Sequence, residues 1–407
     1  MSVETLPQQS QPSADRSGGL GRRQVHAVAA CYFVASFAAL GLPPYLTAIL
    51  PALGDQEARW AGVLYIVPTV FSALGAPLWG RLADRFGRKR LLLRAQLGLT
   101  VSFLLAGAAD SLTAFTLALV LQGFLGGTFA ATNGYLAAAL DGPRLSRALT
   151  LMQGSARAAL VAAPILVGAL SPWIDPHRQY LVMAVLPLAA AVFLSLLPEP
   201  ERPEAATAAD GRPAERTATV SLLPLYAFEF AFVFATVISF PYLIALAEQR
   251  LPGVDGTTTG VLFALPHLCY LVFAARTHTV FHSRPHTGIA LGFGFVALGL
   301  AGHAVAYSLP VFVAVRLLLG AGLTLGLVCL AVLAAGAAQG RQPGRMFGTL
   351  ELVSKGGAVA AGAVAALANG RFGAAAPVVA GTAAALLAAV AATTLTLPSL
   401  RQRWSRR

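Results

Sequence analysis

Long apolar stretches separated by short polar segments run through most of the chain. Six apolar runs lie in the first half, at about 25–50, 60–79, 91–109, 112–140, 148–170 and 180–197, and six in the second, at about 220–247, 258–277, 287–307, 309–336, 347–367 and 375–397. A membrane-spanning helix needs about 20 apolar residues, whereas barrel strands alternate weakly over about ten. The pattern therefore predicts an all-α integral membrane protein with twelve transmembrane helices.

The polar segments divide the chain into five parts. Residues 198–219 are rich in proline and charge and cannot bury a core, so they are interpreted as a flexible cytoplasmic linker. Before the first span there is no cleavable signal pattern, because that apolar run starts late and is too long. The predicted parts are a disordered cytoplasmic tail at 1–23, an N-terminal six-helix bundle at 24–197, the linker, a C-terminal six-helix bundle at 220–397 and a basic cytoplasmic tail at 398–407.

Composition and charge support a membrane protein and argue against a nucleic-acid partner. The chain is 57% hydrophobic and 11% charged, whereas soluble domains carry about 25% charged residues. Most of the basic residues behind the net charge of +12 fall on one side of the predicted spans. Because cytoplasmic loops carry the excess of Lys and Arg, this asymmetry places the protein in the inner membrane with both termini in the cytoplasm.

The chain lacks the motifs of several other classes. It has no phosphate-cradling loop, no nucleophile triad and no metal-ligand spacing, so we expect no enzyme, no ATP-driven pump, no cofactor and no metal. The three cysteines, Cys31, Cys269 and Cys329, lie in apolar runs and are expected to be small core residues.

The two halves of the chain repeat each other with an offset of 197 or 198 residues. The matched positions are Pro44-Tyr45-Leu46 with Pro241-Tyr242-Leu243, Gly62 with Gly260, Pro68 with Pro266, Gly123 with Gly320, and Arg147 with Arg345. Parallel repeats of this kind build transporters whose substrate site lies near the middle of the membrane, between the halves. The repeat therefore predicts two pseudo-symmetric bundles around a central site.

One polar stretch, Gly80 to Leu92, is bounded on both sides by apolar sequence and reads GRLADRFGRKRLL. Its glycines permit a tight reversal between two helices, and its acid can accept hydrogen bonds at a helix start. The stretch closely resembles the cytoplasmic signature loop between helices two and three of the major facilitator superfamily. The resemblance implies the fold of that family, with twelve helices in two bundles, and a conformational latch formed by Gly80, Asp84, Arg85, Gly87, Arg88 and Lys89. A plain basic loop that only sets orientation is the alternative.

Two weaker motifs resemble those of the drug/proton antiporter branch of this family. The sequence LVLQGFLGG resembles the family's second signature, with Leu119 in place of its arginine and with Gln122 and Gly123 retained. The repeat places Arg316 at the equivalent position of the second half. Ala159, Ala163, Pro164 and Gly168 resemble the small-residue pattern of exporters, although small residues favour close helix packing in any case.

Five charged residues within apolar runs are the main candidates for the transport pathway, because charges at membrane depth are costly. They are Arg157, Glu229, Arg316, Glu351 and Lys355. Gln153 with Arg157 repeats as Glu351 with Lys355, each pair spaced by four residues on one helix face. Glu351 and Lys355 can neutralise each other. Glu229 is the first candidate for a proton-carrying acid, because burial favours its neutral form, and a structural ion pair is the alternative.

Polar residues in the first and fourth spans are candidates for lining the cavity. They are Tyr32, Gln122, Thr128, Asn133 and Tyr135, each of which can instead be a helix-packing contact. His267 and His303 are expected to pack within their bundles.

These patterns predict a secondary transporter, a monomer in the lipid bilayer, whose partners are protons and a small molecule. The first hypothesis is proton-coupled efflux of a small drug-like, siderophore-like or anionic molecule. The alternative is a proton symporter that imports an organic acid or a similar nutrient. A transporter-like sensor would need an added cytoplasmic domain or a long ordered tail, and we expect neither.

Overall fold

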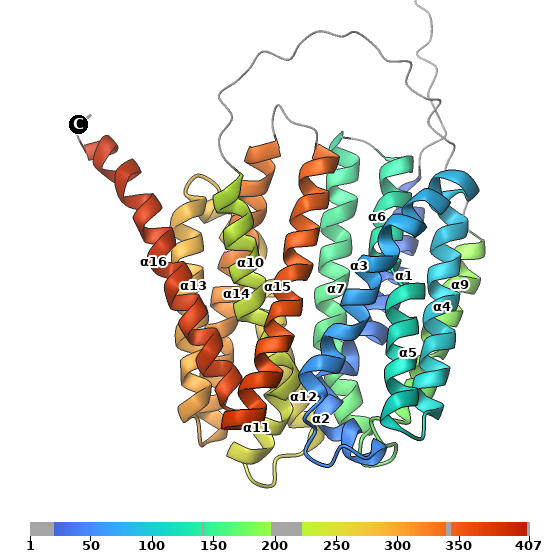
Figure 1. The fold of residues 1–407 in the computed structure, drawn as a ribbon. Helices are drawn as coiled ribbons and strands as arrows, with labels where there is room; N and C mark the ends of the chain where they lie inside the picture. Colours follow the sequence, from blue (N-terminus) through green and yellow to red (C-terminus); the bar gives the residue numbers. More distant parts are fainter. Residues whose placement is uncertain (1–19, 141, 197–221, 339–342, 405–407) are drawn as a thin grey trace, which may run out of the picture.

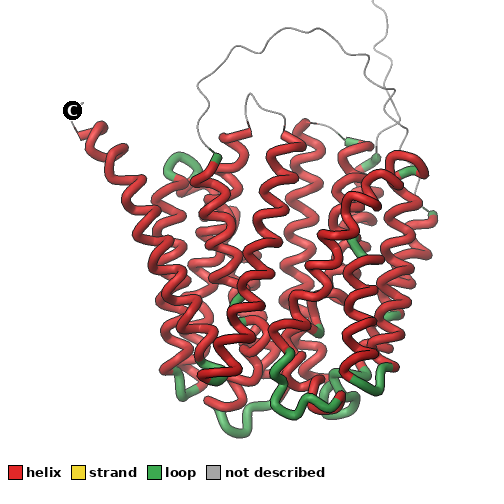
Figure 2. The backbone as a smooth tube through the Cα atoms, viewed as in Figure 1, coloured by secondary structure: helices red, strands yellow, loops and turns green. Residues whose placement is uncertain are grey.

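The computed structural model describes residues 20–140, 142–196, 222–338 and 343–404, and within these ranges the chain is helical without strands (Figures 1 and 2). In the N-terminal half the helices are α1 (Arg22–Gly41), η1 (Pro43–Tyr45), α2 (Leu46–Ile49), η2 (Leu50–Leu53), α3 (Ala61–Phe86), α4 (Arg88–Ala108), α5 (Leu112–Leu125), α6 (Thr128–Ala139), α7 (Gly142–Leu170), α8 (Gln179–Met183) and α9 (Val185–Ser195). In the C-terminal half they are α10 (Leu223–Val237), η3 (Phe240–Tyr242), α11 (Leu243–Arg250), α12 (Gly256–Phe281), α13 (Pro285–Val305), α14 (Leu309–Ala338), α15 (Pro343–Phe372) and α16 (Ala376–Trp404).

The predicted all-α membrane fold is confirmed. Nine helical segments of the described ranges are long and apolar enough to cross a membrane, and three shorter apolar helices occupy the remaining predicted spans, at Ala61–Ala76, Leu112–Leu125 and Gln179–Ser195. Large apolar side chains such as Leu104, Phe273 and Leu298 are exposed on the outer faces of these helices. Such faces suit contact with lipid.

Two predicted boundaries differ from the structure. The polar stretch Gly80 to Leu92 was expected to be a loop, but α3 continues to Phe86 and α4 begins at Arg88. Only Gly87 separates the helices, with a φ of 97° that favours glycine. The fourth span was expected to be one helix over 112–140, but it is broken at Gly126 and Gly127.

The predicted tail 1–23 lies outside the described residues up to residue 19, and α1 begins within it, at Arg22. The predicted linker 198–219 lies outside them entirely. The helix α16 continues to Trp404, so part of the predicted basic tail at 398–407 is helical. The prolines Pro43 and Pro44 follow the end of α1 and form the turn η1.

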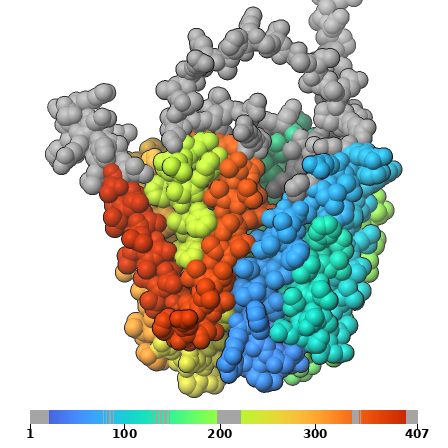
Figure 3. Space-filling model, viewed as in Figure 1, coloured from blue at the N-terminus to red at the C-terminus, as the bar shows by residue number. Residues whose placement is uncertain are grey.

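The two halves contact each other through a symmetric pair of helix crossings, α7 with α12 and α3 with α15. Figure 3 shows α3 bordering the helices of the C-terminal half on one face of the molecule. Further contacts join η1 with η3 and α2 with α11. We call the end of the molecule that holds residues 43–60 and 240–256 the α2–α11 end, which is the lower end in Figure 1.

Glycines bring the crossing helices into backbone contact near the α2–α11 end. Gly62 is the second residue of α3, and a Cβ atom there would lie 2.7 Å from the carbonyl oxygen of Gly362 on α15. Gly256 is the first residue of α12, and its Cβ would lie 2.7 Å from the carbonyl oxygen of Gly168 on α7. No larger side chain fits at these positions without separating the helices.

Two tyrosines from the sequence repeat hold the same end together. The Tyr45 hydroxyl donates to the carbonyl oxygen of Pro164 at 2.6 Å, and the Gly62 amide donates to the Tyr242 hydroxyl at 3.0 Å. Tyr242 belongs to the C-terminal half and Gly62 to the N-terminal half. The repeated Pro-Tyr-Leu motif therefore contributes directly to the packing where the halves meet.

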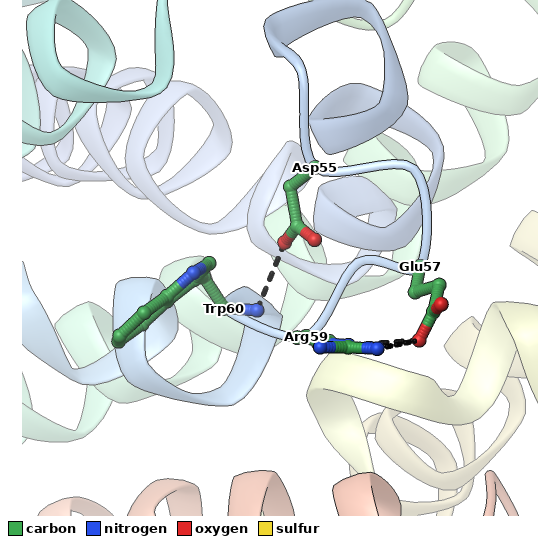
Figure 4. A network of polar contacts seen from close by, with 4 residues as sticks. All are labelled: Asp55, Glu57, Arg59 and Trp60. Atoms are coloured by element: carbon green, nitrogen blue, oxygen red, sulfur yellow. Dashed lines mark hydrogen bonds and ion pairs between the residues drawn. The ribbon is translucent and has the colours of Figure 1, made fainter.

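Local polar contacts fix the starts of α3 and α12. In the loop before α3, the amide of Trp60 donates to Asp55 at 3.0 Å, and Arg59 forms an ion pair with Glu57 at 2.6 Å (Figure 4). Asp255 caps α12 by accepting hydrogen bonds from Thr258, and these hydrogen bonds hold the pKa of Asp255 below its usual value. Both caps lie at the α2–α11 end, beside the crossing glycines.

Candidate functional site

A cavity of about 240 Å³ lies between the two halves. Its walls are mostly apolar, with the rings of Tyr65 from α3 and Phe240 from η3 packed edge to face at 6.4 Å. Polar groups enter from α3, α5, α6 and α15, and they are Thr69, Ser72, Gln122, Thr128, Glu351 and Lys355. A mostly apolar pocket with a few polar groups is the usual form of a small-molecule site.

Glu351 and Lys355 form an ion pair along α15, at 3.6 Å between the carboxylate oxygen and Nζ. The Glu351 side chain is 65% exposed and that of Lys355 is 27% exposed. The predicted mutual neutralisation is therefore what the structure contains. An exposed pair of this kind contributes only about 0–1 kcal/mol of stability, so either partner can turn to a ligand at low cost.

A polar cluster adjoins the cavity and consists of Tyr32 on α1, Arg157 on α7, Glu229 on α10 and Glu351. Glu229 interacts with the hydroxyl of Ser354 and lies within electrostatic range of Arg157 and Glu351. The Tyr32 hydroxyl lies within the same range of Glu351 and Arg157. Glu351 thus belongs both to the cavity wall and to the cluster, which brings together predicted residues from four helices.

Arg157 and Glu229 form no ion pair within 4.0 Å in the described part of the chain. The Arg157 guanidinium instead lies 5.7 Å from the ring centre of Tyr270 on α12, in cation–π geometry. The carboxyl group of Glu229 is therefore not held by a close cation, and its charge can change without breaking a salt bridge.

The remaining predicted pathway residues lie in different places. Gln122 lines the cavity, Tyr32 is buried in the cluster, and Gln153 is exposed on α7. The side chain of Asn133 lies outside the described residues. Arg157, Glu229 and Arg316 do not line the cavity itself.

Arg316 is fully buried within the C-terminal half. Its Nε donates to the carbonyl oxygen of Leu262 at 2.6 Å, and its Nη2 donates to that of Phe263 at 2.8 Å. The Leu262 carbonyl has no helical donor, because Pro266, four residues later, lacks an N–H group. Arg316 therefore caps the carbonyls at the proline in α12, which is a positioning role and not a cavity role.

Replacing Arg316 with methionine should destabilise the protein. The variant leaves the buried Leu262 carbonyl without a donor and removes a second donor from the Phe263 carbonyl, at a cost of about 1–3 kcal/mol for an unsatisfied group. We expect thermal unfolding of the purified protein to occur at a clearly lower temperature. The control is Arg59→Met, since the Arg59 side chain is 68% exposed and pairs with Glu57 at 2.6 Å. An equal decrease in unfolding temperature in both variants would contradict the capping role.

The predicted latch residues lie at the junction of α3 and α4. Lys89 donates to the carbonyl oxygen of Ser195 at 2.9 Å, at the end of α9, and Arg85 lies 5.3 Å from the ring centre of Phe86. Gly87 forms the junction itself. The side-chain contacts of Asp84 and Arg88, and the surroundings of Gly80, lie outside the described part. The Lys89 contact stays within the N-terminal half.

Sequence reasoning missed several cavity residues, namely Tyr65, Thr69, Ser72 and Phe240. The repeat held a usable signal, because Phe240 directly precedes Pro241-Tyr242-Leu243 and Tyr65 lies between the repeated Gly62 and Pro68. The predicted small-residue positions Pro164 and Gly168 form the crossing with α12, and the three cysteines are buried and free, as expected.

Comparison with known proteins gives a family and a set of relatives. The sequence profile described as the Major Facilitator Superfamily matches residues 28–284. The Multidrug resistance protein MdtG of Dickeya zeae (strain Ech586) is 35% identical over 161 residues, which are 38% of this chain and 39% of the relative. The Staphyloferrin B transporter of Staphylococcus aureus (strain NCTC 8325 / PS 47) is 26% identical over 155 residues, 38% of this chain and 37% of the relative. The matched region thus spans about two fifths of these relatives.

Solved structures share the fold over nearly the whole chain. The human organic anion transporter MFSD10 (TETRAN) superposes with a TM-score of 0.68 at 20% identity, covering 91% of this chain and 99% of that chain. A POT family transporter in complex with 5-aminolevulinic acid gives a TM-score of 0.72 at 12% identity, covering 93% of this chain and 95% of that chain. At these identities the likeness concerns the fold alone.

Proposed function

Because the chain belongs to the Major Facilitator Superfamily, we propose that this membrane transporter exports a small molecule in exchange for protons. The observation that carries the proposal is the central cavity between the halves, together with Glu229 in the adjoining polar cluster. The cavity gives a substrate a place at the meeting point of two bundles. Glu229 gives a proton a place close to it.

Alternating access supplies the proposed mechanism. The structure has the halves in contact at the α2–α11 end, through the two glycine crossings and the hydrogen bond between Gly62 and Tyr242. Rocking of the halves about the cavity would open this end and close the other. Protonation of Glu229 removes a charge within range of Arg157 and Glu351, so it changes the electrostatic balance between helices α7, α10 and α15.

The direction of transport, the membrane and the orientation of the chain in it are part of the proposal. The relative named for multidrug resistance supports export, and the basic residues support an inner-membrane protein with both termini in the cytoplasm. In that orientation the α2–α11 end faces away from the cytoplasm. We propose that the protein acts as a monomer, with one cavity for each chain.

Inverted membrane vesicles with an acidic interior test the function. Acridine orange fluorescence reports the pH gradient, and phthalate, citrate and ethidium are added in turn as membrane-impermeant probes of different charge. We expect at least one probe to enter the vesicles and release protons only when the protein is present. Uptake of these probes by intact cells, in place of entry into inverted vesicles, would select import. No proton movement with any probe of the panel would count against exchange.

A further inference from the structure

The fourth membrane span is broken inside the N-terminal half, where α5 ends at Leu125 and α6 begins at Thr128. Gly127 adopts a φ of 85°, which favours glycine, and a Cβ on Gly126 would lie 2.5 Å from the carbonyl oxygen of Gln122. Gly126, Gly127 and Thr128 all line the cavity. The break therefore opens directly onto the proposed substrate site.

Side chains of neighbouring helices donate hydrogen bonds to the carbonyl groups on one side of the break. The indole Nε1 of Trp79 donates to the carbonyl oxygen of Phe124 at 2.6 Å. Arg94 donates to the carbonyl oxygens of Leu125 and Gly126, and its guanidinium stacks 3.4 Å from the ring centre of Trp79. The end of α5 is thus capped within the fold.

The amide side of the break has no side-chain cap among the described residues. Gly127, the residue before α6, provides no side-chain cap. The first N–H groups of a helix have no acceptor within the helix, and unsatisfied groups are costly inside a membrane. The Thr128 side chain is only 5% exposed, and its hydroxyl has no hydrogen-bond partner among the described residues. The start of α6 therefore brings to the cavity the Thr128 hydroxyl and first-turn N–H groups that have no acceptor within the helix.

A second buried polar group faces the same space. Gln122 is 9% exposed, and its Oε1 also lacks a partner in the described ranges. Its amide can present either the oxygen or the NH₂ group to a ligand. Lys355 lines the same cavity, and its weak ion pair with Glu351 leaves it able to turn to an anionic ligand.

We propose that the break between α5 and α6 is a subsite that binds a carboxylate of the transported molecule. The carboxylate accepts hydrogen bonds from the first turn of α6, the Thr128 hydroxyl and the Gln122 amide, where the helix dipole favours an anion. The apolar remainder of the molecule lies against Tyr65 and Phe240. This inference rests on the proposed function, because it assigns a substrate class to the same cavity.

Binding of small aromatic probes to the purified full-length protein in nanodiscs tests the subsite. Benzoate carries the carboxylate, benzamide is its neutral analogue and benzylammonium its cationic one. We expect benzoate to bind more tightly than both analogues. Thr128→Val should lower the affinity for benzoate about tenfold, because it removes a hydrogen-bond donor to a charged group. Gln122→Glu should lower this affinity further, because it places an anion in the subsite. The control is Thr116→Val, since the Thr116 hydroxyl already donates to the carbonyl oxygen of Leu112 at 2.7 Å.

The outcomes separate this inference from the proposed function. Unchanged benzoate affinity in both Thr128→Val and Gln122→Glu, or no preference for benzoate over benzamide, overturns the subsite even if proton exchange is observed in vesicles. Selective loss of benzoate binding supports the subsite even if no proton exchange is observed. Correct folding of each variant is checked by benzamide, whose affinity should stay within about twofold of the unsubstituted protein.

Discussion

Replacing Glu229 and Glu351 together with glutamine is expected to abolish proton-driven transport. Glutamine has nearly the same shape as glutamate, but its side chain cannot bind and release a proton as a carboxylate does. In the inverted vesicles, gradient-driven accumulation of the responsive probe should fall at least about tenfold, because charged groups within a membrane are generally placed for function. Exchange of labelled for unlabelled probe without a gradient should persist, because it needs only the cavity.

The single variants assign the roles of the two acids. Glu229 interacts with Ser354 and has no ion-pair partner within 4.0 Å in the described ranges, whereas Glu351 is paired with Lys355 and largely exposed. We therefore expect Glu229→Gln alone to remove most of the coupling and Glu351→Gln alone to remove less. Glu57→Gln is the control, since Glu57 is an exposed acid paired with Arg59 on the loop before α3. Accumulation that survives in the double variant would refute coupling through these acids.

Much of the fold was predictable because each membrane span must supply its own apolar surface. The apolar runs located the spans, and the repeat correctly aligned the two halves, since its paired glycines both lie at crossings: Gly62 meets Gly362 on α15 and Gly260 meets Pro164 on α7. The spacing of four residues also correctly anticipated the ion pair of Glu351 and Lys355. The apolar runs and the spacing of charges along one helix can be read from the sequence without knowing which helices pack together.

The features that the sequence did not predict depend mainly on contacts between distant segments. The break at Gly126 is invisible in hydropathy, because the apolar pattern continues through it, and its stability depends on Trp79 and Arg94 from other helices. The role of Arg316 was likewise hidden, because it depends on where α14 meets the carbonyls near Pro266. The signature stretch was misassigned as a loop because a helix can extend beyond its apolar run into polar surroundings.

Enlarging Gly168 or Gly62 to leucine should prevent the halves from closing at the α2–α11 end. The carbonyl oxygen of Gly256 lies where a side chain on Gly168 would be, and Gly62 meets the backbone of Gly362 and Ala366. A leucine must therefore separate the crossing helices and weaken the hydrogen bond between Gly62 and Tyr242. Since backbone contacts cannot yield as a flexible side chain can, we expect transport to fall about tenfold or more.

Labelling of the cavity distinguishes a locked conformation from simple unfolding. Leu40→Cys places a thiol in the cavity wall, whereas the native cysteines are buried. A membrane-impermeant maleimide added at the α2–α11 end should label this thiol faster in the Gly168→Leu background. Gly154→Leu is the matched control on α7, because a Cβ there would meet nothing within 4 Å. If Gly168→Leu is labelled no faster than Gly154→Leu and transports equally well, then the crossing of α7 and α12 does not close this end, and the halves must be held together there by other contacts.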